Sequence, residues 1–579
     1  MCGIAGIAGP SSDVIAEQMI EVLRHRGPDD TGLCARPAFA MGTSRLSLVD
    51  IASGAQPTYN ETGSIAVCFN GEIYNHRALR HLLREAGHTF RSESDTEVIV
   101  HLYEMHGERC VDYLHGMFAF AVLDGDRLLL ARDRMGIKPL YYVSLPESGQ
   151  FVFASEIKAI LQCTDYTPRL DTEALADTAL LGYPCGVTTF FKDIRLLAPG
   201  HTLSVALDPG PRVDPPRRYF HKPAVRTDLS MLQAQEALGT TLASAVASHL
   251  SADVEVGLTL SGGIDSTVMA LLARECQRDR PLLTFSIADN EQHTDLLQAA
   301  MVAQLVGSEH VPVIVSFAEY LDAIPAYVAA EESLTDLHVL PFFLLARRIG
   351  ERVKACLYGE GADELFGGYP EYLDRSQRQQ WLPQRLADLR ARGVMPGPHA
   401  QNLVRRYARA SGFDAYLQLV FEDNLGDPLE RQHLHPADKC AMASSVEARV
   451  PYLDDGVVAL VTSLPIAYRV RPDLGIRKHI LRRLCLERFG MATADIVLRD
   501  KQSLPTSGQR HLQRFKQLCA DRLPDSYVKS HEFANYFSEK SELLLFDLFC
   551  EIFFVHRGRH DRVGSIEDFI AARAGRKSL

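Results

Sequence analysis

The sequence predicts an α+β N-terminal domain, followed by an α/β domain with a doubly wound parallel sheet and a helical C-terminal part. Short apolar runs separated by turn residues dominate residues 1 to about 205, which is typical of antiparallel sheets layered with helices. Further along, strand-like runs alternate with longer helical segments, which indicates a parallel sheet with helices on both faces. From about residue 370 to 579 the pattern is mostly helical.

The N-terminal part contains clear strand and turn signals. The apolar run 65–69 predicts a strand that ends at a turn, Asn70-Gly71. Two further apolar runs, 117–123 and 128–131, flank Asp124-Gly125 and predict a hairpin of buried strands.

The alternating part contains candidate strands and helices in sequence. The strands are expected at 254–260, 282–287, 311–315 and 353–358, and the helices at 296–305 and 320–330. Ligands of such folds bind at the carboxyl ends of the parallel strands.

A stretch rich in proline and glycine, residues 208–216, predicts the linker between the two domains. We therefore expect a first domain at 1–207, a linker at 208–225 and a second domain at 226–579. A chain of 579 residues is long enough for two or more domains.

Composition excludes several classes of protein. The net charge of −12 argues against a general nucleic-acid surface, and no apolar run approaches the length of a membrane span. The N-terminus lacks the basic start of a signal peptide, so a cytosolic protein with reduced thiols is expected. The 12 cysteines contain no C-x-x-C pair, which argues against a zinc site.

The turn Ser261-Gly262-Gly263-Ile264-Asp265-Ser266 lies between a predicted strand and a predicted helix. Two glycines let the backbone approach a ligand, and the helix N-terminus offers unpaired N–H groups to an anion. Ser261 and Ser266 add hydroxyl donors, and Asp265 can hold a divalent cation. A serine-rich helix cap is the simpler alternative. No G-x-x-x-x-G-K-[ST] motif occurs, which disfavours ordinary γ-phosphoryl transfer.

Cys2 is the second unusual feature. If Met1 is removed, the thiol and the α-amine belong to the same residue. That amine has a pKa of roughly 8 and can act as a base, which is a known arrangement for an N-terminal nucleophile. Taken by position alone, residue 2 is better explained as an arbitrary start of a chain.

Several motifs occur in a fixed order after Cys2. They are Cys2-Gly3-Ile4-Ala5-Gly6, Arg24-His25-Arg26-Gly27-Pro28-Asp29, Arg45-Leu46-Ser47-Leu48-Val49-Asp50, Phe69-Asn70-Gly71-Glu72-Ile73-Tyr74-Asn75, Ser94-Asp95-Thr96-Glu97, Ala131-Arg132-Asp133-Arg134-Met135-Gly136-Ile137-Lys138-Pro139-Leu140-Tyr141-Tyr142 and Ala154-Ser155-Glu156-Ile157-Lys158-Ala159. Together they resemble the N-terminal-nucleophile glutaminase domain of class II glutamine amidotransferases, a fold of sandwiched antiparallel sheets. The resemblance covers residues 1–205.

The resemblance implies a role for each matching residue. Cys2 attacks the side-chain amide of glutamine, while the Asn70 side chain and the Gly71 N–H stabilise the oxyanion. Arg45 holds the substrate's α-carboxylate and Asp95 its α-amine, since an Arg–carboxylate contact can be bidentate. The implied glutamine pocket consists of Arg45, Val49, Asn70, Gly71, Glu72 and Asp95.

The second half carries its own motifs. They are Ser261–Ser266, Gly359-Glu360-Gly361-Ala362-Asp363-Glu364-Leu365-Phe366-Gly367-Gly368-Tyr369, Ser445-Val446-Glu447-Ala448-Arg449-Val450-Pro451-Tyr452-Leu453-Asp454, Arg477-Lys478-His479-Ile480-Leu481-Arg482-Arg483 and Arg499-Asp500-Lys501. The glycine turn resembles the pyrophosphate loop of the ATP pyrophosphatase superfamily. Residues 240–505 as a whole resemble the synthetase domain of glutamine-hydrolysing asparagine synthetases. This implies an acyl-adenylate intermediate formed with release of pyrophosphate.

The synthetase resemblance also assigns residues. Asp265 and Asp363 would hold Mg²⁺, Glu360 would take a proton from ammonia, and Lys478 would stabilise negative charge. A solvated lysine in a basic run is the alternative for Lys478. The implied ATP site consists of Leu260, Ser261, Gly262, Gly263, Asp265, Ser266, Ile287, Tyr358, Gly359 and Glu360.

Three positions depart from the family pattern. Tyr358 replaces a serine, Leu337 and His338 replace a small polar pair, and the usual aromatic residue is missing after Lys501, at 502–505. The departures are either neutral or they reshape the pocket for a carboxylate other than aspartate, since lost polar partners penalise a polar substrate.

The sequence thus predicts an ATP- and glutamine-dependent amidotransferase that converts aspartate to asparagine. One alternative is the same chemistry on another carboxylic acid in a specialised pathway. A second is ring closure as in β-lactam synthetases, against which the retained glutaminase residues argue, and a third is a non-enzymatic descendant. Ammonia must cross between the sites, so a water-poor tunnel is expected at the domain interface. Dimers are common in the resembled family, which makes a homodimer an expected assembly.

Overall fold

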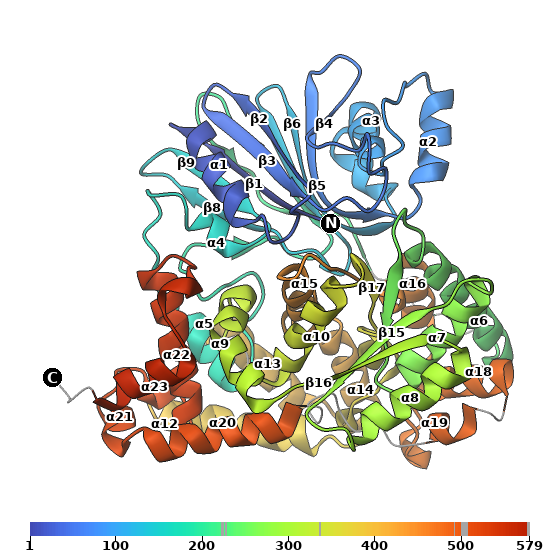
Figure 1. Ribbon diagram of the computed structural model, residues 1–579, viewed down its shortest axis with the longest axis vertical. Coiled ribbons are helices and arrows are strands. Elements are labelled where there is room, and N and C mark those ends of the chain that lie inside the picture. The colour runs from blue at the N-terminus through green and yellow to red at the C-terminus, as the bar shows by residue number, and fades with distance from the viewer. Residues whose placement is uncertain (222–224, 226–227, 335–336, 491–492, 499–507, 576–579) are drawn as a thin grey trace.

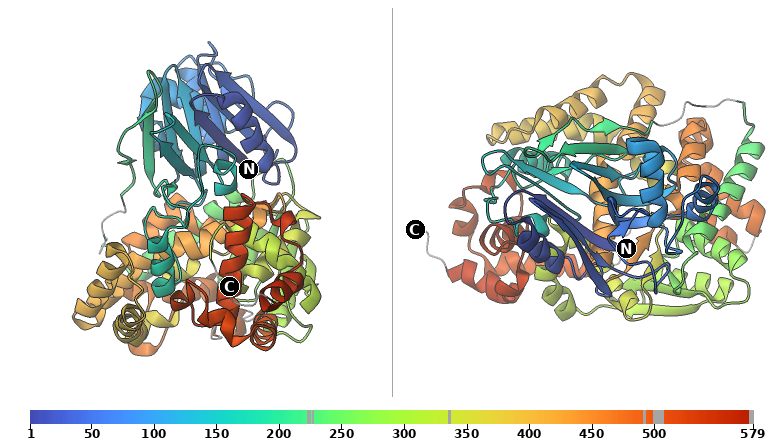
Figure 2. Two further views of the ribbon diagram at one scale, coloured as in Figure 1. Left: turned by 90° about the vertical axis from the view of Figure 1, so that its left-hand side faces the viewer. Right: turned by 90° about the horizontal axis from the view of Figure 1, so that it is seen from above.

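A computed structural model describes residues 1–221, 225, 228–334, 337–490, 493–498 and 508–575. Two layered sheets form the upper part of the molecule in Figure 1, and a third sheet surrounded by helices forms the lower part. The view from the side in Figure 2 shows the same division, with the N-terminus near the junction of the two parts.

The N-terminal domain has two antiparallel sheets. The first has the strand order β10-β8-β9-β1-β3-β2, and the second the order β12-β11-β7-β6-β5-β4 with β13 beside β11. The strands are β1 (Cys2–Ala8), β2 (Asp30–Arg36), β3 (Phe39–Arg45), β4 (Thr58–Tyr59), β5 (Ile65–Ile73), β6 (Gly116–Asp124), β7 (Arg127–Arg132), β8 (Tyr141–Leu145), β9 (Gln150–Ala154), β10 (Arg195–Leu196), β11 (His201–Ala206), β12 (Arg212–Val213) and β13 (Arg217–Arg218).

Apolar side chains fill the space between the two sheets. Ile4 and Ala8 of β1 belong to the same core as Cys68 of β5, Ala121 of β6 and Leu130 of β7. Helix α1 (Ser12–Val22) packs on the outer face of the first sheet. Helices α2 (His76–Glu85) and α3 (Glu97–His106) cover the outer face of the second, which confirms the predicted α+β sandwich.

The predicted hairpin is confirmed, because Asp124 of β6 pairs with Arg127 of β7. The predicted turn at Asn70-Gly71 is wrong. Strand β5 continues through both residues to Ile73, with Asn70 opposite Ala119 and Gly71 opposite Phe118. The reason is local packing, since a Cβ on Gly71 would lie 2.1 Å from the Met117 carbonyl oxygen. Glycine is required here because the backbones of β5 and β6 approach each other closely, and not because the chain reverses its direction.

The C-terminal domain is built on a five-stranded parallel sheet of order β16-β15-β14-β17-β18. Its strands are β14 (Val256–Thr259), β15 (Leu283–Ala288), β16 (Glu309–Ile314), β17 (Ala355–Leu357) and β18 (Glu447–Arg449). The first four match the strands that the sequence predicted. The chain runs outward from β14 to β16 and then crosses to β17 on the other side of β14. This crossing creates a topological switch point at the carboxyl end of β14, where such folds bind ligands.

Two groups of helices contact this sheet and one another. The first group is α6 (Met231–His249), α7 (Ile264–Cys276) and α8 (Thr294–Val306), and the second is α9 (Phe317–Glu331), α10 (Leu340–Gly350) and α15 (His435–Met442). Helix α9 starts directly after β16 with a capping box, in which Ser316 and Glu319 satisfy each other's backbone N–H groups. The helices α8 and α9 confirm the predictions at 296–305 and 320–330.

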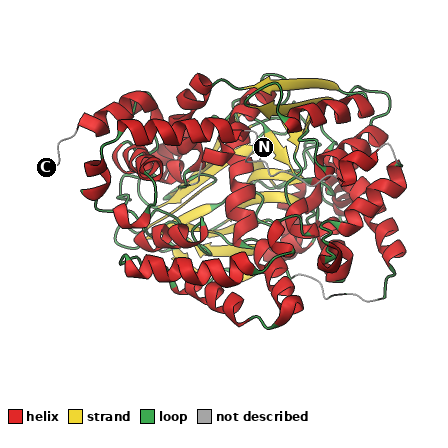
Figure 3. Cartoon of the chain, turned by 90° about the horizontal axis from the view of Figure 1, so that it is seen from below, coloured by secondary structure: helices red, strands yellow, loops and turns green. Residues whose placement is uncertain are grey.

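The C-terminal part is helical, as predicted, and Figure 3 shows helices covering the side of the molecule seen from below. The remaining helices are α4 (Ile157–Ile160), α5 (Thr172–Leu181), α11 (Ala362–Phe366), α12 (Leu382–Ala391), α13 (Pro398–Arg409), α14 (Gly412–Asn424), α16 (Asp455–Ser463), α17 (Ile466–Arg469), α18 (His479–Phe489), α19 (Ala494–Leu498), α20 (Gln509–Arg522), α21 (Asp525–Lys529), α22 (Lys540–Cys550) and α23 (Ile566–Gly575). Among the described residues, no helix combines the length and apolar character that crossing a membrane requires.

The expected linker at 208–225 contains two short strands, β12 and β13, which both pair with β11 at the edge of the second sheet. Residues 222–224 of that linker lie outside the described residues. The division into domains at 207 and 226 stays a prediction.

Buried ion pairs join the two domains. Arg26 donates to Asp438 at 2.8 Å, and Lys138 donates to the other oxygen of the same carboxylate at 3.2 Å. Arg132 donates to Glu430 in the same region, and these partners are almost fully shielded from solvent. Burial without a partner would make each charge costly, so these pairs fix how the domains meet.

Two candidate active sites

The first candidate site lies at the start of β1. Cys2 pairs with Arg45 across β1 and β3, and its backbone N–H donates to Asn70 Oδ1 at 3.1 Å. Gln56 Nε2 lies 3.5 Å from the Cys2 sulfur. Burial raises the pKa of the Cys2 thiol, so a nearby base is needed to form the thiolate.

Asn70 and Gly71 lie beside the thiol on β5. The Asn70 Nδ2 is buried and has no hydrogen-bond partner within the described residues. A buried amide donor without a partner costs stability, which indicates a group kept for a ligand. Its position next to Cys2 fits the role of oxyanion donor that the sequence predicts for Asn70.

A small cavity connects these residues with the rest of the predicted glutamine pocket. The lining includes Cys2, Arg45, Val49, Gly71, Glu72 and Asp95. Arg45 Nη2 donates to the Asp50 carbonyl at 2.8 Å, and Asp95 Oδ2 accepts from the Ile73 N–H at 2.9 Å. The side chains of both charged residues are therefore held in place before any substrate binds.

Gln56 also lines this cavity, and the sequence analysis did not identify it. Its Oε1 accepts from the Phe69 N–H at 2.7 Å, so the side chain lies between β5 and the Cys2 sulfur. A single glutamine before a proline gives no signal in the sequence that would distinguish it from a loop residue.

Charged groups of both domains meet beneath the first site. Arg449 donates from Nη2 to Glu72 at 2.9 Å and from Nε to Glu447 at 2.5 Å. The amino group of Met1 lies 3.4 Å from Glu447. Burial opposes ionisation of Glu447, but Arg449 and the chain's amino group outweigh it and lower the pKa of Glu447. Removal of Met1 would place the Cys2 amine next to this network.

The second candidate site lies at the switch point of the parallel sheet. A cavity of about 90 Å³ is lined by residues from the ends of β14, β15 and β17. It contains eight of the ten residues predicted for the ATP site, and also Asp363. The shared residues are Leu260, Ser261, Asp265, Ser266, Ile287, Tyr358, Gly359 and Glu360.

The glycine turn is shaped by its own hydrogen bonds. The Ser261 N–H donates to Ser266 Oγ at 3.2 Å, and the Gly263 N–H donates to Ser261 Oγ at 3.4 Å. Gly262 has a φ of 67°, and a Cβ there would lie 2.4 Å from Gln298 and 2.8 Å from the Ala299 nitrogen. The turn therefore needs glycine at this position, and helix α7 begins directly after it. Gly262 and Gly263 shape the turn without lining the cavity.

Lys478 bridges the two aspartates that the sequence predicted as metal ligands. Its Nζ lies 2.6 Å from Asp265 and 2.5 Å from Asp363, and its side chain is only 3% exposed. The alternative of a solvated lysine is therefore wrong. Two carboxylates that converge on one cation offer the hard oxygen ligands that suit Mg²⁺, so the residues fit this ion.

Two arginines that the sequence analysis treated only as part of a basic run lie beside this cluster. Arg477 and Arg482 line a small cavity with Lys478 and Gly263. The motif Arg499-Asp500-Lys501 and the departure at 502–505 lie outside the described residues.

Comparisons with known proteins match each half of the chain to a known family. Residues 1–212 match the family model of a glutamine amidotransferase domain, and residues 237–550 match that of asparagine synthase. Glutamine-hydrolysing asparagine synthetase 3 of Bacillus subtilis is 31% identical over 87% of each chain. Glutamine-hydrolysing asparagine synthetase 3 of Arabidopsis thaliana is 33% identical over 83% of this chain and 74% of its own. Asparagine synthetase B of Escherichia coli is 29% identical over 96% of this chain and 91% of its own.

The chain belongs to the asparagine synthase family. It is an ATP-dependent ligase of the glutamine-hydrolysing asparagine synthetase type.

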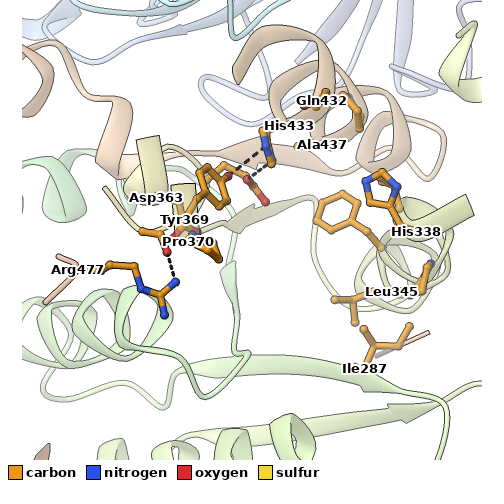
Figure 4. A pocket seen from close by; sticks show the side chains of 16 residues that line it. Ile287, His338, Leu345, Asp363, Tyr369, Pro370, Gln432, His433, Ala437 and Arg477 are labelled. Carbon is orange, nitrogen blue, oxygen red and sulfur yellow. Dashed lines mark hydrogen bonds and ion pairs between the residues drawn. The ribbon is translucent and has the colours of Figure 1, made fainter. Parts of the chain in front are cut away.

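An asparagine synthetase also needs room for an acceptor, and a larger cavity of about 340 Å³ opens beside the nucleotide cavity. Both cavities share Ile287, Phe342, Leu345, Glu360 and Asp363. Figure 4 shows its lining, with the apolar side chains of Ile287 and Leu345 opposite His433 and Tyr369. The remaining lining residues are His338, Val339, Pro341, Gly368, Tyr369, Pro370, Gln432, His433, Pro436, Ala437 and Arg477.

The polar group of this cavity centres on His433. Its ring nitrogens lie 3.5 Å from Glu360 and 3.5 Å from Glu364. The Tyr369 hydroxyl donates to Glu364 at 2.5 Å and lies 3.2 Å from His433 Nε2. Burial disfavours the imidazolium, but the two glutamates outweigh it and raise the pKa of His433 to about 9. Nothing in the sequence indicated His433, because the π-helical segment Leu429–Leu434 that carries it is distant from Glu360 in the chain.

The described departures from the asparagine synthetase pattern surround these cavities. Tyr358 lines the nucleotide cavity, its ring centre lies 4.9 Å from that of Phe342, and its hydroxyl is buried without a partner within the described residues. His338 lines the larger cavity, whereas Leu337 is buried and does not line it. Two of the described departures, Tyr358 and His338, therefore lie in the walls of the candidate site.

Proposed function

We propose that this enzyme hydrolyses glutamine at Cys2 and uses the ammonia to amidate aspartate, which it activates as an acyl-adenylate at the Ser261 turn. The observation that carries the proposal is that both sites meet at Arg449. Its side chain binds Glu72 of the glutamine pocket, and its carbonyl accepts from the N–H of Tyr358 in the nucleotide cavity at 2.8 Å.

In the first half-reaction, the Cys2 thiolate attacks the side-chain amide of glutamine after the α-amine has taken its proton. The Asn70 Nδ2 and the Gly71 N–H donate to the developing oxyanion. Arg45 and Asp95 hold the α-carboxylate and the α-amine, while Val49 and Glu72 complete the pocket. The α-amine then returns its proton to the amide nitrogen, ammonia leaves and a thioester remains on Cys2. Water hydrolyses this thioester to glutamate and the free thiol.

In the second half-reaction, an acceptor carboxylate oxygen attacks the α-phosphorus of ATP and pyrophosphate leaves. Lys478, Arg477 and Arg482 neutralise the leaving group beside the turn. Mg²⁺ bound by Asp265 and Asp363 would supply further charge neutralisation there. Glu360 lies between the nucleotide cavity and the larger cavity, where it can take a proton from the attacking ammonia.

The first experiment separates the half-reactions. Wild-type enzyme should form AMP and pyrophosphate with either glutamine or ammonium as nitrogen source. Cys2→Ala should abolish the glutamine-dependent reaction and keep the ammonium-dependent one. Formation of ADP would contradict adenylation, and glutamine hydrolysis by Cys2→Ala would contradict the thiol nucleophile.

A second candidate is the same chemistry on a carboxylic acid that carries an apolar body. The observation that favours it is the larger cavity. Its volume of about 340 Å³ exceeds what aspartate requires, and its lining is predominantly apolar. A screen of acids scored by pyrophosphate release and by the mass of the amide would decide. Efficient asparagine formation at physiological aspartate would exclude this candidate.

The cellular site is proposed to be the cytosol and the assembly a homodimer. Elution of the purified protein as a monomer at working concentration would contradict the homodimer.

A further inference from the structure

Two histidines and two glutamates converge on the outer side of the N-terminal domain, away from both active sites. Glu61 lies in the turn between β4 and β5, His88 follows α2, and His101 and Glu104 belong to α3. Each offers one ligand atom, and these four atoms all lie within 4.8 Å of one another. His101 and Glu104 are three residues apart on a helix and so share one face.

The distances between these groups suit a tetrahedral ion. Zn²⁺ binds nitrogen and oxygen ligands at about 2.0–2.2 Å, which separates two ligands of a tetrahedron by about 3.4 Å. His88 Nδ1 lies 3.1 Å from Glu61 and 3.9 Å from Glu104, and His101 Nδ1 lies 3.4 Å from Glu61. Only small movements would bring all four atoms onto one ion.

His101 gives an independent indication of a ligand. Its side chain is 1% exposed, and neither ring nitrogen makes a hydrogen bond within the described residues, with Nδ1 3.4 Å from Glu61 and Nε2 3.8 Å from Glu97. A buried imidazole normally has its nitrogens satisfied, because an unpaired buried polar group is costly. The Glu61 oxygen 3.4 Å away is not aligned for a hydrogen bond, whereas an ion between the two groups would satisfy both.

The surroundings also resemble the outer shell of a metal site. Asn60 Nδ2 donates to the Glu104 oxygen at 3.2 Å, and the Thr89 N–H donates to Glu61 at 3.0 Å. Such bonds orient ligating carboxylates. The rings of His88 and His101 lie 4.7 Å apart, so the two imidazoles are neighbours at the proposed site. Glu61 and Glu104 are partly exposed and give an ion access from solvent.

We propose that Glu61, His88, His101 and Glu104 bind one divalent transition-metal ion, Zn²⁺ or a chemically similar ion. The cysteine pattern gave no sign of it, because the ligands are histidine and glutamate. Four protein ligands leave no open position, so the site is structural. It ties the β4–β5 turn and the segment after α2 to α3.

The same segment leads to the glutamine pocket. The N–H groups of Arg91 and Ser92 donate to Glu97 at 2.8 Å each, and Arg80 donates to the Ser94 carbonyl at 2.6 Å. Asp95 follows directly. We therefore expect the ion to preorganise Asp95, a consequence that rests on the proposed glutaminase function.

The test uses the full chain after treatment with a chelator. Co²⁺ should give the visible absorption of a tetrahedral site, and Zn²⁺ should displace it with one equivalent per chain. The double variant His101→Gln/Glu104→Gln should lose this band, and His88→Gln should weaken the affinity at least tenfold. His106→Gln, on the same helix outside the cluster, is the matched control and should bind as wild type.

A correctly folded wild-type protein without a tetrahedral Co²⁺ band would overturn the proposal, as would equal weakening by His106→Gln. His88 is partly exposed, so its variant tests the site even if the double variant fails to fold. Metal removal should raise the KM for glutamine several-fold and leave kcat unchanged. If the glutaminase proposal is wrong, neither the metal-bound nor the metal-free protein will hydrolyse glutamine. The Co²⁺ absorption band still tests the metal site in that case.

Discussion

Arg449 Nη2 donates to Glu72 Oε2 at 2.9 Å, and this bond crosses from the C-terminal domain into the glutamine pocket. The same guanidinium binds Glu447 and the carbonyls of His249 and Ser251. Arg449 is fully buried. One residue of a three-residue strand therefore contacts the walls of both proposed active sites, which would give the two proposed reactions a physical connection.

Replacing this arginine should both destabilise and uncouple the enzyme. Arg449→Met leaves Glu72 and Glu447 buried without their main cation, and breaking a buried pair costs about 3–5 kcal/mol. We expect a lower free energy of unfolding and more glutamate released per pyrophosphate. Denaturant unfolding and the glutamate-to-pyrophosphate ratio measure the two effects.

The double variant Arg449→Met/Glu72→Gln removes one of the unpaired charges. Its loss in free energy of unfolding should therefore be smaller than the sum of the losses in the two single variants. Arg488→Met, which breaks a half-exposed pair with Glu275, is the control and should change stability by less than about 1 kcal/mol. Strictly additive effects of Arg449 and Glu72 would contradict the coupling.

Asn70→Ala should impair only glutamine hydrolysis. It removes the buried Nδ2 that has no partner among the described residues, and loss of one oxyanion donor costs about 10²–10³ in kcat. Ammonium-dependent pyrophosphate release should stay within about twofold of wild type. Steady-state kinetics with each nitrogen source measure this.

Asn75→Ala provides the matching control, since Asn75 belongs to the same motif but donates to the Tyr113 carbonyl outside the pocket. Equal losses of glutaminase activity in both variants would show that Asn70 acts through the fold of β5 instead of the oxyanion.

Lys478→Met should have the opposite selectivity. It leaves Asp265 and Asp363 facing each other without the ammonium that bridges them and removes a cation beside the Ser261 turn. We expect amide formation to fall at least about 100-fold, with glutamine hydrolysis little changed. Pyrophosphate and glutamate are assayed separately.

Arg483→Met tests the same basic run on α18, but Arg483 reaches Gln235 instead of the aspartates. Its synthetase activity should remain near that of wild type. A comparable loss in both variants would mean that general positive charge, and not the bridge, supports the reaction.

The sequence predicted those parts of the structure that depend on local pattern. The Ser261 turn lies at the switch point because its two glycines join a strand to a helix, and the hairpin at Asp124-Gly125 follows from its turn residues. The ordered motifs also predicted that Cys2, Arg45 and Asp95 belong to one site, and all three line the same cavity.

The parts that the sequence could not predict depend on long-range packing. Asn70-Gly71 has the composition of a turn, but its pairing with Phe118 and Ala119 decides the conformation. β18 is too short for any periodicity, and it becomes a strand only beside β17. His433 and Gln56 enter the sites from distant segments, so only tertiary structure reveals their partners.

The charge on His433 should make the stability of the folded chain depend on pH. Folding raises the pKa of His433 from its ordinary value of 6.5 to about 9, because Glu364 and Glu360 outweigh the opposing effect of burial. The protonated form is therefore favoured by the folded state. Its contribution to stability is full below about pH 6.5 and disappears as the pH rises through about 9. His433→Gln should lower Tm at about pH 6, and the difference from wild type should shrink towards about pH 10.

His310 supplies the control, because burial lowers its pKa and its partners are the hydroxyls of Thr284 and Ser286 instead of carboxylates. Protonation of His310 does not stabilise the folded state. The Tm difference between His310→Gln and wild type should therefore not shrink as the pH rises across this range. Thermal unfolding of the three proteins across this range decides the matter. A Tm difference for His433→Gln that stays constant with pH would mean that the imidazole is neutral in the cavity, and then Glu360 would not face a cation before the acceptor binds.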